Sequence, residues 1–512
     1  MISATTPKVS LVKSFTNPFR NAIATARTCY SSKGIITDQD VNEKHFHIAH
    51  STYQAGHHTT LQHAHFQFAI TDVSRHTIWS FLHSHPFYNS EQVSQRYVEV
   101  KPGTFYVPPI SGSALELYLA TQNKLMDYYH QLNESLLGVT TSAYLDRFPA
   151  RKSDQKKIDR DVKKKTQEIA RYVLPVGTFA YLYHTISGIT LLRYWRYCRQ
   201  YETPQETRDL IEAMVRLMLD HDPEFGEIIQ EPLTLEETPE FAQFQQFWQG
   251  KNPTKEFINE FDLSLDGRVS KLIGWSEQAE STVASAVREV YGLASSELSD
   301  VEAINKLLNP AENKIFGENL NLTTHSKLSR AMVHAHYSFR KKLSHAADSQ
   351  DQRHRMTPGS RPILSTHITD DPDYITPVIV NLDEKSKRLY DEAMSVAWDA
   401  IRKLKLLGVS EEYANFLLPN AVSVRFTESG DLLNLHHKHQ MRLCYNAQEE
   451  IWRASLDEAL QISEVHPNIG RFLLPPCSQR SMSGTRPICP EGDRFCGIKV
   501  WRLNREDYSR II

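Results

Sequence analysis

The chain has 512 residues, of which 40% are hydrophobic and 23% charged, so it has the composition of a folded globular protein and not of a disordered or fibrous one. Lys and Arg number 58 against 61 Asp and Glu, and the formal charge of -3 gives no general attraction to nucleic acid or to an anionic membrane. No apolar run approaches the roughly 20 residues that span a bilayer, and the first residues lack the apolar core of a secretory signal. We therefore expect a cytoplasmic protein that binds neither membrane nor nucleic acid.

One pattern occurs twice along the chain, in the same order. The segments around Tyr30, His58, His76 and Pro175 return, with altered spacing, around Tyr291, His325, His345 and Pro419. Duplicated domains with loops of different length have this appearance. We predict a tandem duplication with its join in a stretch of mixed polar, Pro and Gly residues. The predicted parts are an N-terminal domain over 1–250, a linker over 251–280, a C-terminal domain over 281–470 and a tail over 471–512.

Within each half the spacing of apolar residues predicts an α+β fold. The segment HAHFQFAI, residues 63–70, alternates like a half-buried strand. Leu191, Leu192 and Trp195, and then apolar residues between 211 and 218, recur at helical spacing. The Lys-rich segment between this strand and these helices, residues 151–173, is interleaved with Asp and Glu and predicts a solvated helix face.

Residues 55–98 hold seven of the 23 histidines, and three interpretations of this segment compete. A metal site is the first, but no His pair shows i, i+4 spacing with a nearby acid. Ordinary hydrogen-bonded histidines of a strand are the second. The third is a surface that binds anions and aromatic rings, because Arg binds phosphate with two hydrogen bonds and Ser adds a neutral donor. The residues that favour it are Arg75, His76, Ser94, Gln95 and Arg96.

Further Arg residues follow in the first half. Arg171 comes just before a Val-Leu-Pro turn. Arg193, Arg196 and Arg199 recur every three residues, which predicts a row on one face of a helix, with aromatic residues between them. Such a row is more often a solvated stripe. Burying it without an anion is costly, so the aromatic residues between its members favour an anionic ligand nearby.

These segments resemble the flavin-dependent thymidylate synthases. Members of that family carry an H-x-[ST]-x-x-E-H segment, an R-H-R-x7-S signature followed by R-Y, an A-R-x-x-L-P turn, and a helix with a functional Arg that leads into A-Q-x-E-I. The first half matches at His57–His63, Arg75-His76, Ser94–Tyr97 and Ala170–Pro175. The second half matches best at the helix, over Leu433–Arg442, and at Ala447–Ile451. The resemblance covers most of both halves, but no single motif is intact.

The resemblance implies a role for each matched residue. His57, Thr59, Arg75, His76 and, in the second half, His437 correspond to residues that hold FAD. Ser94, Gln95, Arg96 and Arg171 correspond to residues that hold the nucleotide dUMP. The catalytic Arg at the pyrimidine corresponds to Arg442 without a gap, or to Arg199 with one inserted residue. No metal ligand is implied.

Several positions depart from the family pattern. Thr77 replaces the third signature residue, and LHSHPFYNS, residues 82–90, lengthens the spacer before Ser94. In the second half, Asn415 replaces the phosphate-binding Arg, and His345 keeps the signature His with Ser344 before it. A complete site therefore needs residues from both halves.

By this resemblance, the chain is an enzyme that reductively methylates dUMP to dTMP with FAD, methylenetetrahydrofolate and NADPH. The resemblance further implies two tandem domains that pair as a pseudo-dimer, and a homodimer that reproduces the family's tetramer. Two alternatives stay open: a non-catalytic flavin- or nucleotide-binding paralogue, and a metal-dependent enzyme that processes nucleotides. Which half holds the working site also stays open.

The tail contains three of the six cysteines, Cys477, Cys489 and Cys496, at C-x11-C-x6-C spacing. Zinc and iron–sulfur sites usually have four ligands and a tight C-x2-C pair. His466 is a conceivable fourth ligand. The sequence leaves open whether these thiols bind a metal or are reduced and buried.

Overall fold

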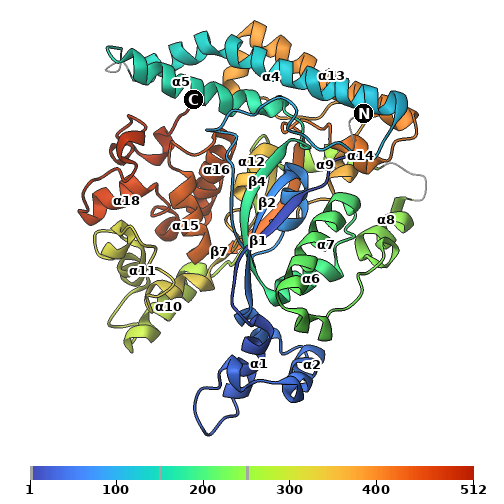
Figure 1. Ribbon diagram of the computed structural model, residues 1–512. Coiled ribbons are helices and arrows are strands. Elements are labelled where there is room, and N and C mark those ends of the chain that lie inside the picture. The colour runs from blue at the N-terminus through green and yellow to red at the C-terminus, as the bar shows by residue number, and fades with distance from the viewer. Residues whose placement is uncertain (1–3, 149–151, 249–252, 512) are drawn as a thin grey trace. The chain divides into compact units, whose positions relative to one another are not determined.

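The computed structural model describes residues 4–148, 152–248 and 253–511 (Figure 1). The chain forms two compact units, each drawn from three stretches of sequence. Unit 1 takes in Met1–Tyr129, Val173–Pro253 and Ala393–Pro419, and unit 2 takes in His130–Tyr172, Thr254–Glu392 and Asn420–Ile512. Each unit thus holds most of one repeat and a shorter stretch of the other. Residues 249–252, at the predicted join, lie outside the described residues, and the predicted domain boundaries stay a prediction.

Unit 1 is built on a four-stranded antiparallel sheet in the order β1-β2-β4-β3. Phe66, Phe68 and Ile70 are buried and alternate with more exposed residues, so one face of the sheet is apolar. The predicted strand is confirmed, although it begins two residues later. The strands are β1 (Lys8–Ser14), β2 (His65–Ser74), β3 (Asn89–Gln92) and β4 (Phe179–Ser187).

Helices of unit 1 pack on this sheet, with α6 and α7 beside it (Figure 1). In α7, which begins with Pro204 at a position where its missing N–H costs nothing, Ile211, Met214 and Met218 are buried at helical spacing. The predicted helices are therefore confirmed. The division between the units falls within α4 (Gly112–Arg147) and within α13 (Glu384–Leu406). The other helices are α1 (Pro18–Thr28), α2 (Phe46–Gln54), α3 (Arg75–Thr77), α6 (Gly188–Arg196), α7 (Pro204–His221), α8 (Pro239–Trp248) and α14 (Glu411–Asn415).

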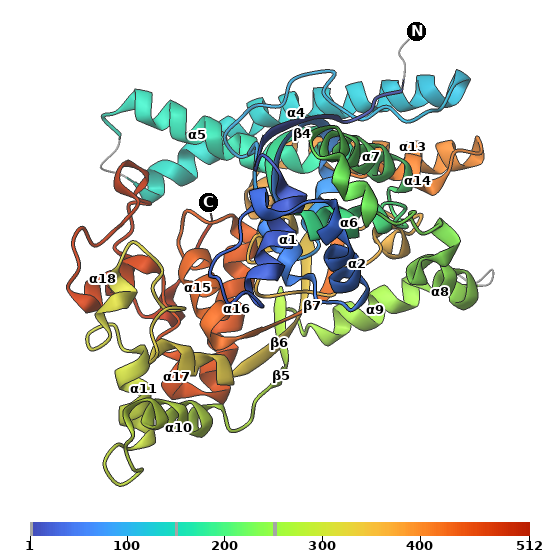
Figure 2. The same cartoon turned by 60° about the horizontal axis from the view of Figure 1, so that its bottom comes forward.

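Unit 2 is built on a three-stranded antiparallel sheet in the order β5-β6-β7, seen side by side in Figure 2. Helices α10 and α11 pack against each other, and their buried apolar residues share a core with those of α15 and α16. The strands are β5 (Ser270–Trp275), β6 (His336–Ser344) and β7 (Ser423–Asp431). The helices are α5 (Gln155–Ala170), α9 (Thr254–Ser264), α10 (Ala279–Tyr291), α11 (Asp300–Leu308), α12 (His345–Asp351), α15 (Leu432–Arg442), α16 (Glu449–Val465), α17 (Pro467–Gly470) and α18 (Pro476–Ser483).

The two sheets repeat one plan. The order β1-β2-β4 of unit 1 corresponds to β5-β6-β7 of unit 2, and a helix follows the second and third strand in both. Strand β3 corresponds in unit 2 to a single antiparallel bridge, because Gly359 pairs with Glu428 of β7 where Ser90 pairs with His184 of β4. Strand β3 lies at the end of the stretch that lengthens the first-half signature. The fold is α+β, as predicted.

Among the described residues, no helix combines the length and the apolar character that crossing a bilayer requires.

Candidate active site

The turn after β2 carries the first part of the candidate site, Arg75 and His76. Ser74 caps the short helix α3, because its Oγ accepts a hydrogen bond from the N–H of Thr77 at 3.0 Å. The fully buried carboxylate of Glu206, on α7, accepts hydrogen bonds from the Ser74 N–H at 2.7 Å and from the Ser74 and Thr77 hydroxyls at 2.5 Å each. Glu206 thereby fixes the turn.

The backbone of this turn is bound to the segment that leads into β4. The N–H of Arg75 donates to the Thr178 carbonyl, and the N–H of His76 donates to the Val176 carbonyl, at 3.1 Å each. Burial lowers the pKa of His76 to about 3, so its imidazole is neutral at physiological pH. The ring stacks on Trp79 with centroids 6.0 Å apart.

Both ends of the loop that carries Ser94, Gln95 and Arg96 are hydrogen-bonded to the first residues of β4. Just before it, the Val93 N–H donates to the Tyr181 carbonyl at 3.0 Å, and just after it the Thr104 carbonyl accepts from the Phe179 N–H at 2.9 Å. The first residues of β4 and those before it, residues 176–181, thus anchor both the Arg75 turn and this loop.

Within the loop, the Ser94 Oγ accepts a hydrogen bond from the N–H of Arg96 at 3.3 Å. The Arg96 guanidinium lies 5.4 Å from the centroid of the Tyr97 ring, and Gln95 is buried. The loop therefore presents a guanidinium and a hydroxyl from neighbouring positions, which is a donor set suited to phosphate.

The other first-half candidates of unit 1 lie on exposed or partly buried positions. His57 and Thr59 are exposed, at the start of the 3-10 helix η3 (His58–His63). Arg199 follows α6, which ends at Arg196. The expectation of an Arg row along one helical face is therefore wrong, because the helix ends before its third member. The Arg196 guanidinium instead donates to the Glu231 carbonyl.

Unit 2 holds the remaining three candidates, Arg171, His437 and Arg442. Arg171 begins the 3-10 helix η6 (Arg171–Val173), is buried, and donates from Nε to the Glu168 carbonyl at 3.2 Å. His437 and Arg442 lie on α15. The Arg442 Nη2 donates to the Gln350 carbonyl at 2.9 Å.

The second repeat builds the same turn after β6. Ser344 caps α12 by accepting from the Ala347 N–H at 3.0 Å, and the buried Glu450 accepts from the Ser344 N–H and hydroxyl at 2.8 and 2.6 Å. Ser344 and Glu450 therefore correspond to Ser74 and Glu206.

This correspondence corrects the sequence alignment by one residue. His345 and Ala346 donate their N–H groups to the carbonyls of residues 422 and 420, as Arg75 and His76 donate to those of residues 178 and 176. His345 thus stands where Arg75 stands, and not where His76 stands. The second repeat has lost both signature side chains.

A buried ionic network fills the interior of the second repeat. Lys341 of β6 contacts Asp351 at 2.6 Å, Glu458 at 3.0 Å and Glu428 at 3.4 Å, and all four side chains are at most 1% exposed. Lys438 of α15 also contacts these three carboxylates. Both ammonium groups are therefore paired with carboxylates within the repeat itself.

The first repeat has a His–Tyr cluster in the corresponding place. On β4 and α6, His184 and Tyr194 are hydrogen-bonded at 3.1 Å, at the positions that Glu428 and Lys438 occupy on β7 and α15. His85, from the insertion, contacts the same Tyr194 hydroxyl at 2.7 Å, and His83 stacks on Tyr88. These histidines pack with aromatic residues. Among the described residues, no three His, Cys, Asp or Glu side chains are grouped to hold a metal ion.

Sequence reasoning missed Glu206, which holds the Arg75 turn from within α7. A signal was present, because Glu206 follows Gln205 as Glu450 follows Gln448 in the A-Q-x-E-I match. The altered spacing hid it.

One known protein family matches both repeats of this chain. The family described as "Thymidylate synthase complementing protein" matches residues 10–224 and 271–468, which together exceed half of the chain. The chain therefore belongs to this family, and it contains two divergent copies in tandem.

Individual relatives agree with this assignment. The chain is 29% identical over 241 residues to the flavin-dependent thymidylate synthase of Geobacter sulfurreducens, covering 46% of this chain and 97% of the relative. It is 29% identical over 150 residues to that of Saccharolobus solfataricus and 32% identical over 133 residues to that of Pyrococcus furiosus, covering 56% and 52% of those relatives and 28% and 25% of this chain.

One solved structure is similar over a part of the chain. It is a UMP/dUMP methylase, PolB, from Streptomyces cacaoi, bound with 5-Br dUMP. The match has 17% identity and a TM-score of 0.32, and covers 45% of this chain and all of the other. A TM-score this low carries no structural conclusion.

Proposed function

We propose that this chain is an FAD-dependent thymidylate synthase that converts dUMP to dTMP, with methylenetetrahydrofolate as carbon donor and NADPH as reductant. Family membership supports a flavin-dependent enzyme of this kind. The observation that supports a working site in the first repeat is the joint anchoring of the Arg75 turn and the Ser94–Arg96 loop to residues 176–181. The second repeat lacks the side chains of the corresponding turn.

The donor set of unit 1 fits a flavin cofactor. Arg75, His57 and Thr59 offer a guanidinium, an imidazole and a hydroxyl, which suit the phosphates and the carbonyl oxygens of FAD. His76, buried and neutral, supplies an uncharged ring edge. When bound, FAD supplies the hydride for the reaction. We assign His437 of the second repeat to the same role.

The nucleotide phosphate is assigned to Ser94, Gln95, Arg96 and Arg171. Arg96 holds the phosphate with two parallel hydrogen bonds, and the Ser94 hydroxyl adds a third donor. These contacts bind substrate and fix its orientation, and they leave the pyrimidine ring to other residues.

Negative charge develops on the pyrimidine carbonyls when C5 of dUMP attacks the methylene carbon. A fixed cation there lowers the free energy of the transition state. Arg199 of the first repeat and Arg442 of the second are the two candidates. A site completed by Arg442 would join residues of both repeats.

Such a site requires the repeats to pair as a pseudo-dimer, and two such chains to form the homodimer. A bridge within unit 1 supports this pairing. Pro175 and Pro419 occupy equivalent positions of the two repeats and pair with each other in antiparallel fashion. Equivalent residues meet in this way across a two-fold axis.

Two linked assays test the proposal. The full-length chain is expressed in a host that requires thymidine, and the purified chain is incubated with dUMP, FAD, methylenetetrahydrofolate and NADPH. We expect growth without thymidine and formation of dTMP. If the purified chain retains FAD and binds dUMP but forms no dTMP, the chain is the non-catalytic paralogue and the catalytic proposal is overturned.

A further inference from the structure

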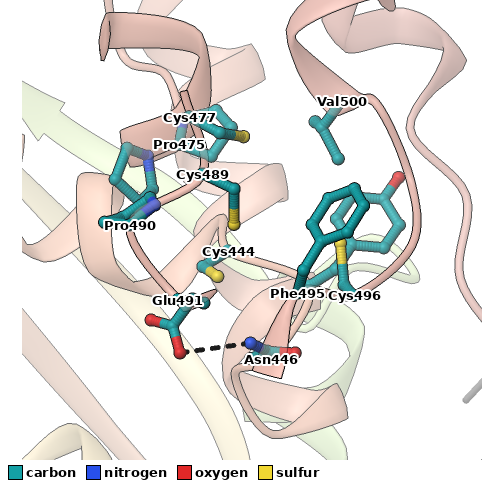
Figure 3. Close-up of a pocket in the computed structure, with 12 residues that line it drawn as sticks. Cys444, Asn446, Pro475, Cys477, Cys489, Pro490, Glu491, Phe495, Cys496 and Val500 are labelled. Carbon is teal, nitrogen blue, oxygen red and sulfur yellow. Dashed lines mark hydrogen bonds between the residues drawn. The ribbon is translucent and has the colours of Figure 1, made fainter. Parts of the chain in front are cut away.

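Four of the six cysteines line one pocket in the C-terminal stretch of unit 2 (Figure 3). Cys444 follows α15, Cys477 lies in the first turn of α18, and Cys489 and Cys496 lie in the loop after α18. Figure 3 shows their side chains directed into this pocket from these separate segments. All four are free thiols.

The sequence pattern had identified only three of these thiols. The conceivable fourth ligand, His466, is engaged elsewhere, because its Nδ1 lies 3.0 Å from the Tyr337 hydroxyl and its Nε2 lies 3.3 Å from the Glu277 carbonyl. The structure supplies Cys444 in its place, from the segment that follows α15 and precedes the tail. Four thiols at one pocket make a complete donor set for a thiophilic metal centre.

The remaining walls of the pocket are mostly apolar, with Pro475, Pro490, Phe495 and Val500 among them. Its one carboxylate, Glu491, accepts a hydrogen bond from the Asn446 side chain at 3.3 Å. An apolar shell around thiols favours a bound cluster over free, charged thiolates, because it restricts access of solvent.

The arrangement of the thiols favours a cluster over a single ion. A zinc ion holds all its sulfur ligands about 2.3 Å from one point. Among the described residues, no three side chains are grouped in that way. In a [4Fe–4S] cluster each cysteine binds a different iron, and the sulfurs lie farther apart.

We propose that Cys444, Cys477, Cys489 and Cys496 ligate an iron–sulfur cluster in unit 2. On loading, each thiol releases its proton and forms one S–Fe bond. The site uses none of the residues assigned to FAD or dUMP, so it stands or falls separately from the proposed enzyme.

Iron and acid-labile sulfide in the full-length chain, purified without oxygen or reconstituted with iron and sulfide, test the proposal. We expect about four of each per chain, and an electron paramagnetic resonance signal after reduction. Visible colour does not serve, because bound flavin absorbs in the same region. The Cys444→Ala and Cys489→Ala chains are expected to lose both iron and sulfide, whereas the Cys29→Ser chain, altered at an exposed cysteine of unit 1, is expected to retain them.

Circular dichroism of the variants shows whether they fold. The iron and sulfide content of the unaltered chain tests the proposal even if the variants do not fold. A reconstituted, folded chain without iron overturns the proposal. So does about one zinc per chain that is lost in the same variants and comes without sulfide.

Discussion

Glu206 links the interior of unit 1 to the candidate site, because its carboxyl group holds the turn that presents Arg75 and His76. Burial raises the pKa of Glu206 to about 7, although hydrogen bonds from Ser74 and Thr77 act to lower it. The folded chain therefore binds this proton at a higher pH than the unfolded chain does. The stability that Glu206 contributes is present below its ordinary pKa and is lost as the pH rises to about 7.

Replacing Glu206 with Gln removes this dependence. Between pH 4.5 and 7.5 the unaltered chain is expected to lose about 3 kcal/mol of unfolding free energy through this group, and the Glu206→Gln chain is expected to lack that part of the loss. Urea unfolding across the pH range measures it. Glu212→Gln, at an exposed position of the same helix, is the control. Equal pH profiles for both variants would contradict the assignment.

Arg96 is the residue on which the proposed dUMP binding depends most directly. Its replacement by Ala would remove the proposed charged, two-point phosphate contact, so we expect dUMP binding to weaken by about 2 to 4 kcal/mol. Calorimetric titration with dUMP measures the change. Arg216→Ala, which removes an exposed guanidinium paired with Glu212, is expected to bind dUMP normally. Unchanged affinity after Arg96→Ala would remove Arg96 from the site.

At the scale of single residues, the sequence identified the polar side chains of the candidate site but not the contacts that position them. Arg75, His76 and Arg96 stand out by residue type and order. The anchoring contacts do not, because they are backbone hydrogen bonds to residues 176–181 and one carboxylate from α7. The shift of His345 by one position was likewise visible only from the cap at Ser344.

Helix α15 of the second repeat differs from α6 of the first, because Lys438 stands at the position of Tyr194. Lys438 is fully buried and contacts Glu428, Asp351 and Glu458. Its replacement by Met leaves the buried carboxylates with one cation fewer, so we expect a loss of about 3 to 5 kcal/mol of unfolding free energy. Urea unfolding checks it, with Lys387→Met, at a half-exposed i, i+4 pair, as the control. A loss below about 1 kcal/mol would contradict the buried network.

Regular elements were the more predictable part of the fold. The apolar residues that alternate in β2 and recur at helical spacing in α6 and α7 are buried in the structure, as predicted. Strand β3 was not predicted, because the pattern of the insertion gave no strand signal and pairing with β4 creates it. The Arg row failed because α6 ends at Arg196, whose carbonyl accepts a hydrogen bond from the distant Leu233 N–H at 2.9 Å.

At the scale of the whole molecule, each compact unit uses stretches of both repeats. The turn at Gly177 illustrates this within unit 1. Its N–H donates to the Phe416 carbonyl at 2.9 Å, and a Cβ on Gly177 would lie 2.8 Å from that oxygen. Order of the motifs predicted the duplication, but no sequence pattern showed that residues 393–419 of the second copy belong with the first.

Gly177→Ala tests this exchange. Because the clash is with backbone, we expect a loss of about 1 to 3 kcal/mol in unfolding free energy. Gly226→Ala, in the same unit with open space around the added carbon, is the control and is expected to change stability by about 0.5 kcal/mol at most. Thermal unfolding of the two variants compares them. Equal stability would mean that the Gly177 and Phe416 backbones do not meet.

We propose that this tandem chain methylates dUMP with electrons from its own bound flavin. A single turnover tests it most directly: the FAD-loaded chain is reduced without oxygen, and dUMP and methylenetetrahydrofolate are then added together. We predict that the flavin reoxidises and that one dTMP forms for each flavin reoxidised. Flavin that stays reduced, or that reoxidises without dTMP, would contradict the claim.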